Sequence, residues 1–113
     1  MKQTMFTFPV PCHNYAMSDG SGRDPAFSHI ELSLVSVLHD ACEIVSSPGQ
    51  LPGGAYAGSK YVWAMYGVEP NGHVCHMADH DTLRHAIDVL TGLGIVSGKQ
   101  AEQILERAEP VNL

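Results

Sequence analysis

The sequence predicts an α+β fold in which a small antiparallel sheet packs against one long helix and a C-terminal helical hairpin. Three observations carry this prediction: two strand-like runs around a Pro–Gly turn, a long segment with apolar residues at helical spacing, and two short segments with helix-capping signals. The chain has 113 residues, close to the commonest size of a single domain. We therefore expect one domain that spans residues 1–113.

The clearest local signal is a β-hairpin over residues 61–78. Its first half is rich in aromatic and β-branched residues, and its turn, Glu69-Pro70-Asn71-Gly72, has Pro and Gly where a type I turn favours them. An earlier run, Met5–Val10, has a similar composition but contains Pro9, which cannot donate to a β-ladder. We expect that run to form at most an edge strand.

A long helix is predicted between the two strand-like regions. Ser28–Glu31 offers a capping box with Phe27 placed as a hydrophobic staple, and Asp24-Pro25 offers a second possible start. The loop Pro48–Lys60, rich in Gly and Pro, would end the helix. The apolar residues at helical spacing are Ile30, Leu34, Val37, Leu38, Ala41, Ile44 and Val45.

Two shorter helices are predicted in the last third of the chain. Asp79 or Asp81 would cap the first, and Gly94 would end it. The segment Ser97–Gln100 is a capping box for the second, which Pro110 would end. The short connection between them predicts a helical hairpin.

Composition and charge exclude several classes of protein. Forty-four per cent of the residues are hydrophobic and 16% are charged, which argues against a disordered chain and a coiled coil. The net charge of −6 argues against direct binding of nucleic acid and against an anionic membrane surface. No apolar run has the length of a membrane-spanning helix, and the first residues lack the apolar core of a signal peptide.

The cysteines point to a reducing compartment. The chain has three of them, Cys12, Cys42 and Cys75, an odd number that does not suggest a disulfide framework. We expect reduced thiols in a cytoplasmic protein.

Histidine is unusually frequent, with seven residues, and four potential ligands lie close together in the sequence: His73, Cys75, His76 and His80. Imidazole and thiolate are the ligands that zinc and similar metals prefer. However, adjacent strand residues point to opposite faces, and the spacing matches no established metal or catalytic motif. The sequence therefore predicts no enzyme and no cofactor. A small metal-binding protein, or a metal- or thiol-dependent enzyme that uses this cluster, is the alternative.

Two surface features favour a binding function. The first is an acidic stripe on the last predicted helix, where Glu102, Glu106 and Glu109 are spaced to share a face and suit a basic partner. Asp40 and Glu43 on the long predicted helix would extend this stripe if the two helices packed side by side.

The second feature is the loop that precedes the hairpin. Its large apolar residues, Leu51 and Tyr56, are candidates for contacts with a partner. Trp63, the only tryptophan, is instead expected in the core, because its strand is apolar on both faces.

The sequence therefore favours a small acidic, non-enzymatic binding protein. We expect an inhibitor or adaptor that docks onto a larger protein or nucleoprotein complex with a basic surface. Phage anti-defence proteins, including the anti-CRISPR proteins, are the class whose size and acidity fit this description. A homodimer is left open.

Overall fold

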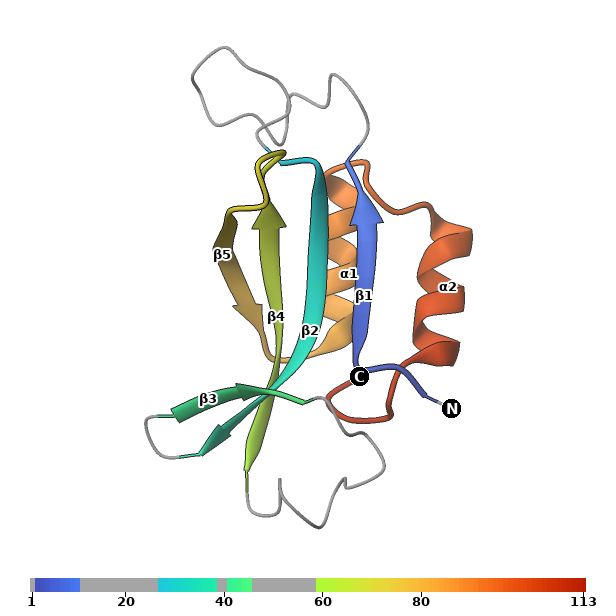
Figure 1. Cartoon of the computed structure of the whole chain (residues 1–113). Coiled ribbons are helices and arrows are strands. Elements are labelled where there is room, and N and C mark those ends of the chain that lie inside the picture. The colour runs from blue at the N-terminus through green and yellow to red at the C-terminus, as the bar shows by residue number, and fades with distance from the viewer. Residues whose placement is uncertain (1, 11–26, 39–40, 46–58) are drawn as a thin grey trace.

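A computed structural model describes residues 2–10, 27–38, 41–45 and 59–113. In these ranges the chain forms an antiparallel sheet and two helices, which confirms the α+β class (Figure 1). The elements are β1 (Met5–Pro9), β2 (His29–Leu38), β3 (Ala41–Ile44), β4 (Lys60–Val68), β5 (Val74–His80), α1 (Leu83–Gly92) and α2 (Gly98–Arg107).

The sheet is built around the long strand β2. Strands β4 and then β5 lie on one side of it, while β1 and β3 both pair with its other side. β1 pairs with the first half of β2 and β3 with the second half. The two short strands meet at Leu34, which donates to the carbonyl of Thr4 and accepts from the N–H of Val45, at 2.8 and 2.9 Å. The predicted edge strand is confirmed as β1.

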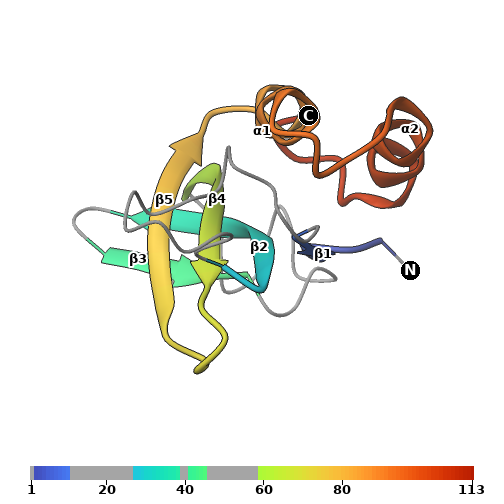
Figure 2. The same ribbon diagram turned by 90° about the horizontal axis from the view of Figure 1, so that it is seen from above.

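The core lies between the helices and one face of the sheet. Both helices lie on the same side of the sheet, with α2 displaced toward the outer edge of β1 (Figure 2). Ile30, Leu32 and Leu34 project to this side from β2, and Trp63 and Met65 project from β4. All five are at most 1% exposed, so Trp63 is a core residue, as the sequence predicts.

The predicted hairpin is confirmed as β4 and β5. Gly72 donates to the carbonyl of Glu69 at 2.8 Å, and Glu69 donates to the carbonyl of His73 at 2.9 Å, which closes the turn. Gly72 has a φ of 90°, a conformation that glycine adopts without strain. The register shifts between Met65 and Tyr66, where β5 carries a bulge.

The long helix predicted from residue 30 to residue 45 is wrong, because this part of the chain forms β2 and β3. The hydroxyl of Ser28 does not cap a helix but donates to the carbonyl of Val68 at 3.1 Å. Phe27 does not staple a helix but packs over Gly67 of β4. Ile30, Leu32 and Leu34 also fit a period of two, and pairing with strands on both sides of β2 selects this period over the helical one.

The two C-terminal helices are confirmed, with one correction at a cap. Thr82, rather than Asp79 or Asp81, is the N-cap of α1 and accepts from the N–H of His85. The chain reverses after α1 at Gly94, which has a φ of 76°. The capping box of Ser97 and Gln100 is present at the start of α2. Neither helix has both the length and the apolar character needed to cross a membrane.

Candidate functional site

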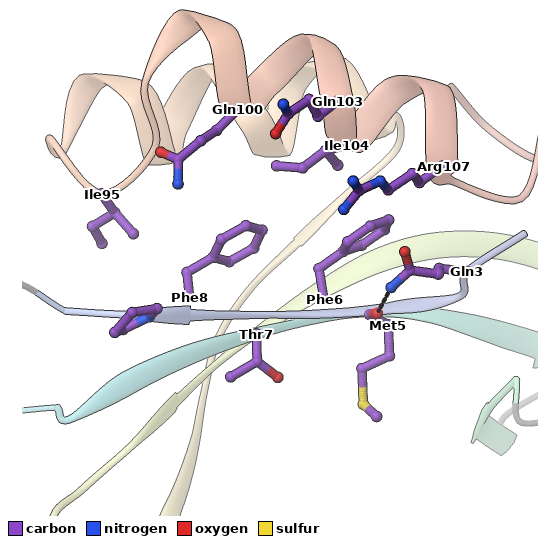
Figure 3. Close-up of a pocket in the computed structure, with 11 residues that line it drawn as sticks. Gln3, Met5, Phe6, Thr7, Phe8, Ile95, Gln100, Gln103, Ile104 and Arg107 are labelled. Atoms are coloured by element: carbon purple, nitrogen blue, oxygen red, sulfur yellow. Dashed lines mark hydrogen bonds between the residues drawn. The ribbon is translucent and has the colours of Figure 1, made fainter.

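A groove runs between the edge strand β1 and helix α2 (Figure 3). Phe6 and Phe8 form its floor, with their rings pointing toward α2 and their centroids 6.4 Å apart. The opposite wall comes from α2 and the loop before it, through Ile95, Gln100, Gln103, Ile104 and Arg107. The volume is about 430 Å³, within the range of roughly 300–1,000 Å³ typical of ligand sites.

The backbone of β1, and not its side chains, forms one wall of the groove. At the two ends of β1, Thr4 and Val10 make backbone hydrogen bonds of 2.8 and 3.0 Å to β2 and to the residue just before it. Antiparallel pairing alternates, so the N–H and C=O groups of Met5 and Thr7 point the other way, to the outer edge of the sheet. Pro9 adds an outward carbonyl but no donor.

The outer edge of β1 is closed at one end. Gln3 donates to the carbonyl of Arg107 and accepts from the N–H of Glu109, both at 2.8 Å. Past this point, within the described part of the chain, the only partner of the outward groups is the side-chain amide of Gln3, 3.4 Å from the carbonyl of Met5. With respect to residues 2–10, 27–38, 41–45 and 59–113, the edge is thus paired at Gln3 and open from Met5 to Pro9.

The closed end carries positive charge. Arg107 lines the groove beside Gln3 and Phe6 (Figure 3). Among the described residues its guanidinium forms no ion pair. Lys2 lies near this end and donates from Nζ to the carbonyl of Glu106 at 2.6 Å. An acidic group that enters the groove would find an unpaired guanidinium.

The predicted acidic stripe is only partly on a helix. Glu102 and Glu106 are exposed on α2, and they lie on the side of the helix away from its buried Ile104. Glu109 lies beyond the end of α2, which stops at Arg107, and its backbone pairs with Gln3. None of the three lines the groove.

The other predicted contact residues are not brought to this site. Glu43 lies on β3, not on a helix, and β3 is remote from α2 in both views (Figures 1 and 2). The condition under which Glu43 would extend the stripe, two helices packed side by side, is not met, because Glu43 lies on a strand. Asp40, Leu51 and Tyr56 lie outside the described residues.

The structure separates the predicted histidine and cysteine cluster into three places. His73 and Cys75 lie together beside the turn of the hairpin, where Glu69 joins them. His76 lies on another face, where its Nε2 is 2.8 Å from Asp79 Oδ1. His80 is buried against His85, with ring centroids 5.0 Å apart. Glu69, His73 and Cys75 are the described residues that form a possible metal-binding group.

Two buried or half-buried groups have shifted pKa values. Burial lowers the pKa of His80 from the ordinary 6.5, and the neighbouring His85 lowers it further, against an opposing effect of Asp79 and Asp81. Burial also raises the pKa of Tyr66 above 10.0, with a contribution from the nearby Asp79 carboxylate. Neither group lines the groove.

The side chains that face the groove from α2 were not among the predicted binding residues. Gln100, Gln103 and Arg107 recur at the spacing of one helical face, and this was the available signal. Only the position of β1 beside α2 places that face along a groove.

No family model, no curated protein and no solved structure matches this chain.

Proposed function

We propose that this protein is a binding module that takes up an extended, carboxylate-terminated segment of a partner protein as an additional strand along β1. The observation that carries the proposal is the open outer edge of β1 facing helix α2 across an apolar floor. The proposal retains the non-enzymatic docking function expected from the sequence. The narrower expectation of an anti-CRISPR inhibitor has no support in the described residues, and the acidic stripe lies outside the groove.

The backbone of β1 favours a strand as the occupant. Unpaired N–H and C=O groups at a sheet edge are a template for another strand. A peptide that pairs with Met5 and Thr7 would satisfy them with main-chain hydrogen bonds, while pockets for alternate side chains supply specificity. A compact ligand would leave most of these groups unpaired.

The side chains favour a mixed apolar and polar segment. Phe6 and Phe8 line the groove and are each 8% exposed, so they offer a small area of ring surface to an apolar side chain of the peptide. Gln100 and Gln103, on the opposite wall, carry amides that both donate and accept hydrogen bonds. These amides suit the outer edge of the added strand.

The closed end of the groove determines where an added antiparallel strand ends and which side chain its terminus meets. An antiparallel strand would run from Pro9 toward Gln3, and it must stop there because Gln3 already pairs with the segment after α2. Its C-terminus would then lie beside Arg107. A terminal carboxylate would form a charge-assisted hydrogen bond with this guanidinium, which is the reason for proposing a C-terminal segment.

The experiment is a selection from displayed random peptides with free C-termini, run on the full-length protein. We expect enrichment of sequences with an apolar residue near the terminus, and loss of binding when the terminal carboxylate is amidated. Arg107→Glu should weaken the selected peptides at least tenfold, because a hydrogen bond to a charged group is worth about 1.5–3 kcal/mol. Glu102→Lys, on the same helix but outside the groove, is the matched control and should change little.

A second copy of this chain is the other possible occupant of the edge. A dimer that dissociates when the outer edge of β1 is blocked would overturn the proposal in favour of self-association. Failure to enrich any peptide, or equal binding of acid and amide forms, would also overturn it.

A further inference from the structure

Three metal-ligating side chains of different kinds converge where the β4–β5 hairpin turns. His73 Nδ1 lies 2.6 Å from Glu69 Oε2 and 3.8 Å from Cys75 Sγ. All three donor atoms lie within 4.8 Å of one another. His73 is well exposed, with 67% of its side chain accessible, so an ion could reach the group from solvent.

The turn itself positions these residues. Glu69 and His73 lie on the two sides of the turn, because the N–H of Glu69 donates to the carbonyl of His73. The side chain of Asn71 fixes the turn further, since its Oδ1 accepts from the N–H of His73 at 2.9 Å. Cys75 lies near the start of β5, two residues after His73, and its Sγ is on the same side as His73 Nδ1, 3.8 Å away. The turn therefore brings the three residues together, and the hydrogen bond between Glu69 and His73 orients two of the side chains.

The spacing suits a tetrahedral ion. Zinc bonds of 2.0–2.3 Å at tetrahedral angles place neighbouring ligand atoms about 3.3–3.8 Å apart. The distance between Cys75 Sγ and His73 Nδ1 already has this value. Glu69 Oε2 and His73 Nδ1 are closer because a hydrogen bond joins them, and an ion would replace the proton between them.

We infer that Glu69, His73 and Cys75 form a zinc site at the turn of the hairpin, with the fourth position left to solvent. A thiolate and an imidazole favour Zn²⁺ over Mg²⁺ and Ca²⁺, which prefer oxygen ligands alone. Zinc binds the thiolate of Cys75 and the lone pair of His73 Nδ1, so the thiol proton is released to solvent and the proton of the neutral imidazole is carried by Nε2; affinity therefore falls as pH falls. This site is separate from the groove, and it stands or falls independently of the proposed peptide binding.

The test is titration of the untagged, reduced full-length protein with Co²⁺ and then with Zn²⁺. Cobalt reports on the site through the charge-transfer absorption of a cobalt–thiolate bond, and zinc should abolish that band by displacement. We expect one ion per chain. Cys75→Ser should abolish the band, and His73→Asn should weaken zinc binding more than about 100-fold, since even outer-shell changes cost about 10–100-fold.

Cys42→Ser and His76→Asn are the matched controls. Cys42 is an exposed thiol on β3, and His76 pairs with Asp79 away from the turn. Both variants should retain the band and the stoichiometry. Emission from the buried Trp63 would verify that each variant is folded. Absence of the band in the folded wild type, its persistence in Cys75→Ser, or its loss in Cys42→Ser would overturn the assignment.

Discussion

The indole Nε1 of Trp63 donates a hydrogen bond to the carbonyl of Val111 at 3.0 Å. This bond joins the centre of the sheet to the segment that follows α2. The next two residues complete the attachment, because the carbonyls of Asn112 and Leu113 accept from the N–H groups of Leu83 and Arg84 at the start of α1. The segment thus satisfies backbone donors that a helix N-terminus leaves without partners.

Replacing Trp63 with Phe should therefore destabilise the protein. The change removes both the hydrogen bond to Val111 and part of a side chain that is 0% exposed. We expect a loss of about 2–4 kcal/mol in the free energy of unfolding, from the cavity and from the unpaired carbonyl. Urea denaturation followed by circular dichroism measures it, and a loss below about 0.5 kcal/mol would contradict the packing described.

Gly67→Ala should also be destabilising. A Cβ at Gly67 would lie 2.6 Å from the ring of Phe27, which must shift to accommodate it. We expect a cost of about 1–3 kcal/mol from this overpacking. Gly92→Ala is the control: a Cβ there meets nothing within 4 Å, at the last position of α1, and should be neutral or stabilising. The thermal unfolding temperature should fall for Gly67→Ala and stay unchanged or rise for Gly92→Ala, and equal shifts would argue against the contact with Phe27.

The buried His80 should make stability depend on pH. Its pKa is lowered in the folded state, chiefly by burial, so the unfolded chain binds a proton more readily. The stability that neutral His80 provides is present above pH 6.5 and is lost as pH falls from 6.5 toward the lowered folded pKa. His80→Phe should reduce this loss, since it removes the titrating group and an Nε2 that has no hydrogen-bond partner among the described residues.

The measurement is the free energy of unfolding of both proteins at several pH values below 7. His85→Asn provides a second comparison: it removes the contribution of His85 but leaves His80 buried, so the pH dependence should be reduced and not abolished. Parallel curves for wild type and His80→Phe across this range would contradict the assignment.

The acidic residues of α2 provide a test between two binding surfaces. If the stripe expected from the sequence were the docking surface, Glu102→Lys and Glu106→Lys together would weaken binding, most strongly at low salt. Because neither side chain lines the groove, we expect the affinity for a selected peptide to change less than about threefold. Fluorescence anisotropy at two salt concentrations measures it. A large loss confined to low salt would favour the stripe.

The hairpin and the last two helices were predictable because their signals are local. The Pro70–Gly72 turn and the capping box at Ser97 specify their own backbone within a few residues. The segment that begins at Ile30 was not predictable in this way. Its apolar residues fit a helical and a strand period equally, and strands far away in the sequence decide between them by pairing with β2.

The groove could not be predicted from the sequence for a similar reason. It joins Phe6 and Phe8 to residues of α2 that lie far along the chain, and one of its walls is backbone, which no side-chain motif reports. At the hairpin, the sequence singled out His73 and Cys75 but not Glu69, because the pairing across the turn brings that carboxylate to them. The alternation of side chains along β5 and the bulge in that strand place His76 and His80 away from the turn.

Two substitutions at Thr7 test directly whether peptides bind along the outer edge of β1. Thr7→Pro removes the outward N–H, and the strand should tolerate it, because Pro9 already occupies the equivalent position two residues on. Thr7→Val keeps that N–H and serves as the control. The peptide selection is repeated on both variants and on wild type.

We expect Thr7→Val to enrich the same peptides as wild type and Thr7→Pro to bind them at least about tenfold more weakly, since at least one backbone hydrogen bond is lost. Equal enrichment by all three proteins would show that peptides bind without the edge of β1. That result would contradict the proposed binding of a peptide strand along β1.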